Sequence, residues 1–244
     1  MFFSIITPTF NSEKFIKRHI DSLNLQKNIF EQIVIDNYSS DQTLKIIKSR
    51  AKYPIRIVKE KDDGIYDAMN KGAKYANGDF YLFLNSDDWI DPETFILVEK
   101  KIRDNPNFDI YYGNTRYFKQ EELYFEQKSK IKFLQFTNSI SHQAIYYKNS
   151  IFLKNTYNKN YKIAADYDFN LNLLNKDYKF FYINEFLSNN SMGGASSRLL
   201  PSFKEFYSIQ IKNNGVIKGI LFTFYEYKFK ILKLFILLFN DKKN

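Results

Sequence analysis

Cysteine is absent from this 244-residue chain, and histidine occurs only twice, as His19 and His142. The absence of cysteine excludes disulfide bonds and thiolate metal sites. Two histidines are too few for a metal site built mainly from imidazoles. Any metal ion must therefore bind to oxygen ligands.

The chain also lacks the usual membrane-targeting segments. The N-terminus has no basic region followed by a long apolar core and a cleavage site, so we expect no signal peptide and a cytoplasmic location. The apolar segment 216–239 is interrupted by Lys218, Lys228, Lys230 and Lys233, which argues against a membrane-spanning helix. Its basic and aromatic composition favours an amphipathic helix lying on a membrane surface.

Basic residues outnumber acidic residues, and the formal net charge is +9. This balance favours anionic partners such as nucleic acid, acidic lipid headgroups or nucleotide phosphates. The lysines are scattered and no nucleic-acid motif is present, so we expect no nucleic-acid partner. The length fits one large domain, with or without an appendage.

Apolar strand patterns alternate with helical patterns in the first 100 residues. Strands are expected at 4–6, 30–35, 55–58 and 80–84, and helices at 12–26 (with Ser12 as N-cap), 43–51 and 65–75. This alternation predicts an α/β fold with a mainly parallel sheet flanked by helices. Further strands are expected at 108–116, 140–147 and 180–183, a hairpin over 117–125, and a helix at 166–174.

The most informative segment is an apolar run that ends in Leu84-Asn85-Ser86-Asp87-Asp88. Two adjacent carboxylates at the tip of a buried strand are suited to Mg²⁺ or Mn²⁺, which take carboxylate, phosphate and water oxygens. Ligands of open α/β sheets bind beyond the carboxyl ends of the strands. A solvated turn is the alternative interpretation, because Asp, Asn and Ser are common turn residues.

Polar clusters follow four expected strands, at residues 7–11, 36–41, 62–70 and 85–88. A parallel sheet brings these strand ends to one edge. Several carboxylates on one edge repel each other unless a cation or hydrogen-bond donors offset them. The clusters together therefore predict a metal–diphosphate site.

Four segments carry a resemblance to the inverting family 2 glycosyltransferases of the GT-A fold. They are Ile6-Thr7-Pro8-Thr9-Phe10-Asn11, Val34-Ile35-Asp36-Asn37-Tyr38-Ser39-Ser40-Asp41, Asp63-Gly64-Ile65-Tyr66-Asp67-Ala68-Met69-Asn70-Lys71-Gly72 and Leu84-Asn85-Ser86-Asp87-Asp88. The third segment is similar to bacterial enzymes that build O-antigen and exopolysaccharide repeat units. The resemblance is strong over residues 4–92, looser to 197 and absent from the tail.

The resemblance implies a Rossmann-like, mixed but mainly parallel sheet in a GT-A domain over residues 1–200. Residues 1–100 would bind the nucleotide and residues 101–200 the acceptor, followed by a helical, membrane-associating tail over 201–244. It also implies a set of nucleotide-binding residues: Pro8, Thr9, Phe10, Asn11, Asp36, Asn37, Asp63, Asn70, Asn85, Ser86 and Asp87. Within this set, Phe10 would stack on the base and Asp36 would accept the uracil N–H.

The resemblance assigns a metal ion, Mn²⁺ or Mg²⁺, to Asp87 with Asp88 beside it. Asn85 departs from the family's Asp-x-Asp pattern, so metal binding would depend chiefly on Asp87, while Asn85 would bond a ribose hydroxyl. Asp166 resembles the catalytic base, although a carboxylate that opens a helix is also a plausible N-cap.

Three further residues are expected at the sugar and acceptor site: His142, Gln143 and Asp168, the last also an alternative base. A lone histidine on a strand is more often structural. The segment Gly193-Gly194-Ala195-Ser196 resembles a loop that closes over the donor phosphates, or is simply a linker.

These features together predict transfer of a hexose from a UDP-sugar to a lipid-linked (polyprenyl diphosphate) saccharide in cell-surface polysaccharide synthesis. The enzyme would lie on the inner face of the cell membrane. One alternative is a non-catalytic docking module with a degenerate sugar-nucleotide fold, which Asn85 favours. A sugar nucleotidyltransferase is disfavoured because residues 7–12 contain no glycine. The tail, in turn, could pack on the domain or form a homo-oligomer contact instead.

Overall fold

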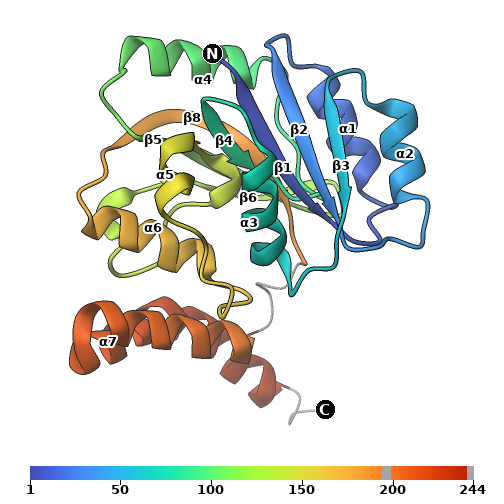
Figure 1. Cartoon of the computed structure of the whole chain (residues 1–244). Coiled ribbons are helices and arrows are strands. Elements are labelled where there is room, and N and C mark those ends of the chain that lie inside the picture. Colours follow the sequence, from blue (N-terminus) through green and yellow to red (C-terminus); the bar gives the residue numbers. More distant parts are fainter. Residues whose placement is uncertain (194–198, 241–244) are drawn as a thin grey trace.

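One mixed sheet organises the chain. In the residues that the computed structural model describes (backbone 1–193 and 199–240, side chains 1–193 and 200–228), the strands follow the order β3-β2-β1-β4-β7-β5-β6, and β8 also pairs with β5. Figure 1 shows helices on both sides of this sheet and the long C-terminal helix α7 below it. The expected mixed, mainly parallel α/β sheet with a helical tail is confirmed.

The strands are β1 (Phe3–Thr9), β2 (Phe30–Asp36), β3 (Ile55–Lys59), β4 (Phe80–Phe83), β5 (Ile110–Lys119), β6 (Glu122–Gln127), β7 (Ile145–Lys148) and β8 (Phe180–Ser191). The α-helices are α1 (Ile16–Asn24), α2 (Thr43–Arg50), α3 (Ile65–Tyr75), α4 (Thr94–Asp104), α5 (Asn149–Lys154), α6 (Ala165–Asn175) and α7 (Leu199–Asn240), and the short 3-10 helices are η1 (Ile131–Phe133) and η2 (His142–Ala144). Strands β1 to β4 are mutually parallel, β7 is antiparallel to β4 and β5, and β8 is parallel to β5.

Strand β2 shows how the sheet separates two helical layers. Successive side chains of a strand point to opposite faces. Val34 packs with α1 and α2, whereas Ile33 and Ile35 belong to the core under α3. Helix α3 lies close to the sheet at Gly72, where a Cβ atom would stand only 2.4 Å from Cγ2 of Ile6.

The register of the parallel strands places their polar ends at one edge. Thr9 of β1 pairs with Asp36 of β2, which pairs with Lys59 of β3. Strand β4 ends one position before Leu84, so the segment from Asn85 to Asp88 leaves the sheet at the same edge. This edge is where ligands of open α/β sheets bind.

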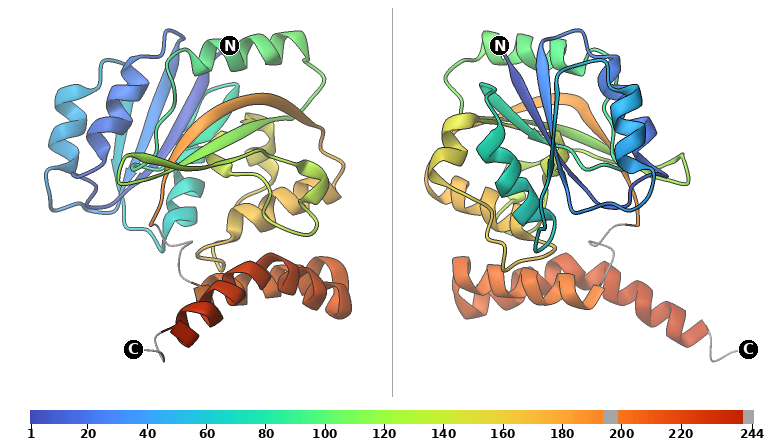
Figure 2. Two further views of the ribbon diagram at one scale, coloured as in Figure 1. Left: turned by 180° about the vertical axis from the view of Figure 1, so that it is seen from behind. Right: turned by 45° about the vertical axis from the view of Figure 1, so that its right-hand side comes forward.

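Helix α7 consists of two arms that meet at Gly215, whose φ of 75° and ψ of 171° are not helical. The arms pack on each other, with 2.5 Å between the Ser202 and Tyr227 hydroxyls. The first arm also packs on α6, where the ring of Phe206 stacks on Tyr167 at a centroid distance of 4.9 Å. Figure 2 shows the two arms below the domain from two more directions. Within the described residues, no helix has the length and apolar character needed to cross a membrane.

The structure corrects several predicted elements. Ser12 does not cap α1, which begins at Ile16; instead its carbonyl accepts the N–H groups of Phe15 and Ile16. The strand expected at 140–147 is wrong for its first half, because residues 142–144 form the turn η2. Helices α4 and α5 were not predicted, and β8 continues to Ser191.

Candidate active site

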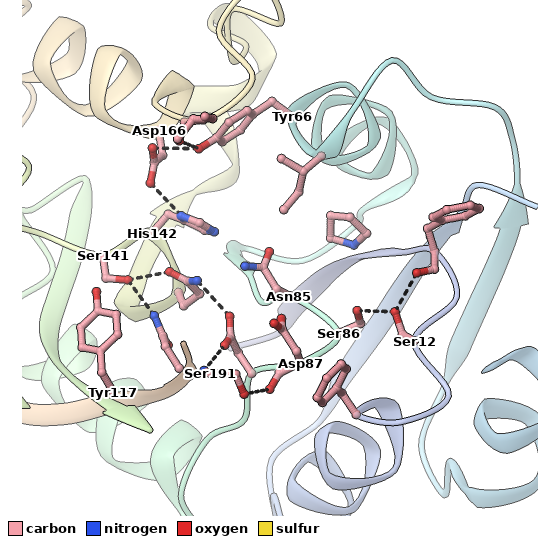
Figure 3. A pocket seen from close by; sticks show the side chains of 18 of the residues that line it. Ser12, Tyr66, Asn85, Ser86, Asp87, Tyr117, Ser141, His142, Asp166 and Ser191 are labelled. Carbon is pink, nitrogen blue, oxygen red and sulfur yellow. Dashed lines mark hydrogen bonds and ion pairs between the residues drawn. The ribbon is translucent and has the colours of Figure 1, made fainter. Parts of the chain in front are cut away.

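A cavity of about 420 Å³ opens at the carboxyl edge of the sheet (Figure 3). Its walls come from the loops after β1 and β4 and from α3, η2, α6 and β8. A second cavity of about 370 Å³ shares Pro8, Phe10, Ser12, Ile65 and Ser86 with it, so the two form one groove.

The segment after β4 presents Asp87 to the first cavity and turns Asp88 into the protein. Asp88 is buried, and its two carboxylate oxygens accept hydrogen bonds from the Ser191 N–H (2.8 Å) and the Gln143 side-chain amide (2.9 Å). Burial, and then the charge of Asp87, raise the pKa of Asp88 well above its ordinary value. Asp88 therefore ties the segment to β8 and η2, and since it also lines the cavity, its place beside a metal stays a prediction.

The side chain of His19 binds the backbone of this segment. Its Nδ1 lies 2.8 Å from the carbonyl oxygen of Asp88, and its Nε2 lies 2.7 Å from the side-chain nitrogen of Gln32. Because the carbonyl only accepts, Nδ1 donates and Nε2 accepts from the Gln32 amide. Burial lowers the pKa of His19 to about 4, so the ring is neutral near neutral pH.

Asp87 is half-buried in the cavity wall. Burial raises its pKa, and the opposing influences are its own backbone N–H and the charges of Arg18 and His142. The described residues contain no group of three or more acidic or histidine side chains able to hold a metal ion by themselves. One carboxylate nevertheless fits a Mg²⁺-like ion, which takes one or two protein carboxylates and completes its shell with substrate phosphates and water.

The end of the groove that Phe10 and Asn37 line is suited to a nucleotide base, with the buried Asp36 next to Asn37 in sequence. Asp36 is fully buried at the end of β2, and its Oδ2 accepts the Ser39 N–H at 3.0 Å. Its Oδ1 is buried and has no hydrogen-bond partner among the described residues. The Phe10 ring is 59% exposed at the rim. An unpartnered buried acceptor beside an exposed ring is suited to bind a base that carries a ring N–H.

Asp166 lies on the wall opposite this end, at the start of α6 (Figure 3). Its Oδ2 lies 2.8 Å from Nδ1 of His142, and its Oδ1 accepts from the Tyr66 hydroxyl and the Tyr167 N–H, each at 2.9 Å. Burial favours the neutral acid, but hydrogen bonds from His142, Tyr66 and the Tyr167 N–H outweigh it, so the pKa of Asp166 is lowered. Asp166 is therefore an ionised carboxylate with donors on both oxygens.

Most of the predicted site residues line the two cavities. These are Pro8, Thr9, Phe10, Asn11, Asn37, Asn85, Ser86, Asp87, Asp88, His142, Gln143 and Asp166.

Four predicted site residues are not among those that line the two cavities. Asp36 is fully buried at the end of β2, next in sequence to Asn37, which does line the second cavity. Asp168 points away from the groove and accepts Nζ of Lys212 on α7 at 3.0 Å. The side chain of Asn70 exchanges two 2.9 Å hydrogen bonds with the Tyr157 backbone. The Asp63 side chain is 70% exposed, and Asp62 lines the groove instead. The predicted loop continues past Gly193 into residues 194–198, which are outside the described residues.

Sequence reasoning missed several groove residues from distant segments: Ser12, Tyr117, Ser141, Lys162, Asn190 and Ser191. Ser12 meets Ser86 at 2.8 Å between hydroxyls, and Asn190 donates to the Ser141 hydroxyl at 3.1 Å. Only Ser12 could have been found from the sequence, because it directly follows the polar residues at the end of β1. The others depend on β5, η2 and β8 meeting in three dimensions.

Comparison with known proteins identifies the relatives of this chain. The profile described as Glycosyl transferase family 2 matches residues 4–178. A Mycobacterium bovis protein named PGL/p-HBAD biosynthesis glycosyltransferase is 32% identical over 213 residues, covering 84% of this chain and 82% of the relative. The Staphylococcus aureus poly(ribitol-phosphate) beta-N-acetylglucosaminyltransferase TarS is 42% identical over 100 residues, which cover 38% of this chain and 18% of TarS.

Solved structures share the fold at lower sequence identity. The crystal structure of S. aureus TarS 1–349 in complex with UDP-GlcNAc has a TM-score of 0.71 and 20% identity, covering 93% of this chain and 74% of that one. The mannosyltransferase PcManGT from Pyrobaculum calidifontis, in complex with GDP-Man and Mn²⁺, has a TM-score of 0.67 and 14% identity, covering 92% of this chain and 69% of that one.

Proposed function

Since the chain belongs to glycosyl transferase family 2, we propose that it transfers a hexose from a UDP-sugar to an acceptor hydroxyl with inversion at the anomeric carbon. The observation that carries this proposal is that Asp87 and the bonded pair Asp166–His142 line one cavity. A carboxylate able to hold a cation thus faces a base in the space where a sugar would lie. This arrangement supports a leaving diphosphate on one side and an attacking hydroxyl on the other.

The donor nucleotide is assigned from the base end of the groove. Oδ1 of Asp36 lacks a partner among the described residues, and the N3–H of uracil would satisfy it. Adenine and cytosine have no ring N–H at the corresponding position. Guanine has one, and PcManGT is described with GDP-Man, whereas TarS is described with UDP-GlcNAc. We favour UDP, and a guanine donor is the alternative to test.

The catalytic roles follow from the two walls of the cavity. The acceptor oxygen attacks the anomeric carbon as the bond from that carbon to the diphosphate oxygen breaks, and UDP leaves with the electron pair. The pair Asp166–His142 receives the acceptor proton as general base. Asp87 would hold a Mn²⁺ or Mg²⁺ ion, which when bound neutralises charge on the leaving diphosphate.

The acceptor is assigned from helix α7. An apolar stripe on the second arm is here called the outer face of α7, and its residues are 49–77% exposed. It consists of Val216, Ile217, Ile220, Leu221, Phe224 and Tyr225. The opposite side of this arm, with Gly219, Thr223 and Tyr227, packs inward. An apolar stripe on a chain with net charge +9 is suited to an anionic membrane surface. We therefore propose a lipid-linked saccharide acceptor and peripheral attachment to the membrane.

The test is release of UDP or GDP from a panel of donors: UDP-Glc, UDP-Gal, UDP-GlcNAc and GDP-Man, each with Mn²⁺, Mg²⁺ or EDTA. We expect turnover with at least one UDP-sugar and none with GDP-Man, and loss of turnover in EDTA. Turnover with GDP-Man alone would overturn the donor assignment. Binding of UDP without turnover of any donor would favour the non-catalytic docking module.

A further inference from the structure

His142 is one of three residues lining the cavity, with Asn85 and Asn190, that have a buried polar atom without a hydrogen-bond partner among the described residues. His142 is 7% exposed, and its Nε2 has no hydrogen-bond partner among the described residues. Figure 3 shows the ring between Asp166 and the open centre of the cavity, with the edge away from Asp166 directed toward Asn85. A buried nitrogen without a partner is costly unless a ligand satisfies it.

The partner of Nδ1 decides which nitrogen carries the proton. Nδ1 lies 2.8 Å from Oδ2 of Asp166, and the pKa of this carboxyl is lowered chiefly by His142 and then by the donors from Tyr66 and the Tyr167 N–H. An ionised carboxylate only accepts hydrogen bonds, so Nδ1 must carry a hydrogen, and in a neutral ring this is the only hydrogen on nitrogen. Nε2 then carries the lone pair, and that lone pair faces the cavity.

Asp166 itself is poorly placed to take a proton. Both of its oxygens already accept hydrogen bonds, from His142 on one side and from Tyr66 and the Tyr167 N–H on the other. These three donors use three of the four acceptor sites of the carboxylate, so a new proton could enter Asp166 only at the remaining site of Oδ2, beside the bond from His142. A proton on Nε2 of His142 displaces none of them, and the adjacent carboxylate stabilises the resulting imidazolium.

From this geometry, and resting on the proposed function, we propose that Nε2 of His142 receives the acceptor proton and that Asp166 acts through it as a positioning residue. The acceptor O–H proton passes to Nε2 while the oxygen forms its bond to the anomeric carbon. The bond between that carbon and the diphosphate oxygen breaks, and its electron pair leaves with UDP. The imidazolium returns its proton to water after the product departs.

Several charged or titratable groups share the cavity with His142. Asp87 and Asp88 lie after β4, Tyr66 and Asp166 on α3 and α6, Tyr117 on β5, and Lys162 before α6. Of these, Asp166 and Tyr66 contact His142 directly. The Tyr66 ring lies at a centroid distance of 6.5 Å from the His142 ring, and its hydroxyl donates to Asp166. The contact with Asp166 sets the orientation of the imidazole.

The test compares His142→Gln and His142→Ala with the wild type, using release of UDP to water from the best UDP-sugar of the panel and Mn²⁺-dependent binding of UDP by calorimetry. We expect kcat to fall by about 10²–10⁴-fold while the Kd for UDP stays nearly constant. Added imidazole should restore part of the kcat of His142→Ala in a saturable way and leave the wild type unchanged. Thermal melts would establish that both variants are folded.

A spectroscopic measurement on the wild type does not depend on any variant's folding. The chain has only two histidines, so ¹⁵N-labelled imidazole signals are few, and those of His19 serve as the internal reference. We expect His142 in the neutral form with hydrogen on Nδ1. The tautomer with hydrogen on Nε2 would overturn the proposal.

Two kinetic outcomes would also overturn it. Near-normal kcat in both His142 variants, together with loss of kcat in Asp166→Asn, would make Asp166 the direct base. Weaker UDP-sugar binding at constant kcat would make His142 a donor-binding residue. A wild type that binds no UDP and turns over no donor would instead refute the proposed function itself.

Discussion

Oδ2 of Asp166 and Nδ1 of His142 lie 2.8 Å apart, although the two residues are separated by 24 positions in the chain. Asp166 belongs to α6 and His142 to the turn η2, so this bond joins two elements that line the cavity. It fixes the plane of the imidazole and leaves the opposite edge of the ring facing the space for substrate. Any change to either residue therefore alters the position of the other.

Asp166→Asn should lower kcat by about 10²–10⁴-fold with little change in UDP binding. An amide in place of the carboxylate no longer fixes hydrogen on Nδ1 of His142 or stabilises the imidazolium. Steady-state UDP release and calorimetry measure the two effects.

The matched control is Asp168→Asn, two positions later on α6. Its carboxylate pairs with Lys212 outside the groove, so this variant should lose thermal stability and retain most of its kcat. Comparable loss of kcat in both variants would contradict the assignment of Asp166.

Asp87→Asn should remove the metal-dependent part of UDP affinity and lower kcat. Asp87 and Asp88 both line the cavity, but both oxygens of Asp88 are bonded within the protein, which leaves Asp87 to hold the metal. Titrations of UDP with and without Mn²⁺ should therefore coincide for the variant and differ for the wild type. If Mn²⁺ still strengthened UDP binding to the variant, the metal would be held elsewhere.

Asp36→Asn should weaken UDP binding by about 10- to 100-fold, the range expected when a buried donor–acceptor pair is replaced by an unpaired one. The Ser39 N–H can still bond the amide oxygen, so the amide NH₂ would face the base and meet its N–H. Calorimetry with UDP measures the loss. Unchanged affinity would show that Asp36 is a purely structural residue at the end of β2.

The protein should lose stability as the pH falls from about 6.5 toward 4, because His19 is buried in its neutral form. Its pKa is lowered to about 4 by burial, so between these values the unfolded chain binds more protons than the folded one. The difference between this pKa and the ordinary pKa of histidine corresponds to about 3 kcal/mol of the free energy of unfolding. About 2 kcal/mol of it would be lost between about pH 7.5 and 5.

Urea unfolding at these two pH values measures this loss. His19→Gln should be less stable at neutral pH, but its stability should depend less on pH over the same interval. An equal pH dependence in the variant and the wild type would assign the acid sensitivity to other groups.

The double variant Ile217→Ser/Leu221→Ser should bind anionic vesicles less tightly than the wild type. Both residues belong to the outer face of α7 and are 77% and 61% exposed, so the change removes apolar surface without disturbing the core. Cosedimentation with phosphatidylglycerol vesicles measures the effect. Leu153→Ser, at an 81% exposed site on α5, is the matched control and should bind as the wild type does. Equal binding by all three proteins would indicate that the outer face contacts protein instead of lipid.

The elements of the first 100 residues could be predicted well from the sequence because their signals are local. Apolar runs such as 30–35 and 80–84 end in polar clusters, and each end marks both a strand boundary and a groove residue. Helix α4 escaped detection because it follows Glu93, which has a positive φ of 65° and gives no capping signal. The turn η2 was taken for a strand because its residues are as buried as those of β7, and burial alone does not separate the two.

The orientation of the acidic side chains was beyond the reach of the sequence. Asp87 and Asp88 are identical neighbours, and only the donors from Gln143 and Ser191 decide which of them turns inward. Asp166 and Asp168 differ in the same way, because Lys212 on α7 lies next to one and His142 next to the other. All of these partners come from segments more than 20 positions away in sequence.

The carboxylate of Glu205 on α7 accepts the backbone N–H groups of Lys162, Ile163 and Ala164, at 2.7, 2.8 and 2.9 Å. The N-cap of α6, Ala164, makes no side-chain hydrogen bond of its own, and the first arm of α7 anchors the segment that leads into the helix. The start of the helix that carries Asp166 is thus anchored by the same helix that carries the outer face. A chimera that exchanges the tail for that of another protein would therefore have to keep an acid at position 205 to hold the segment before Asp166 in place.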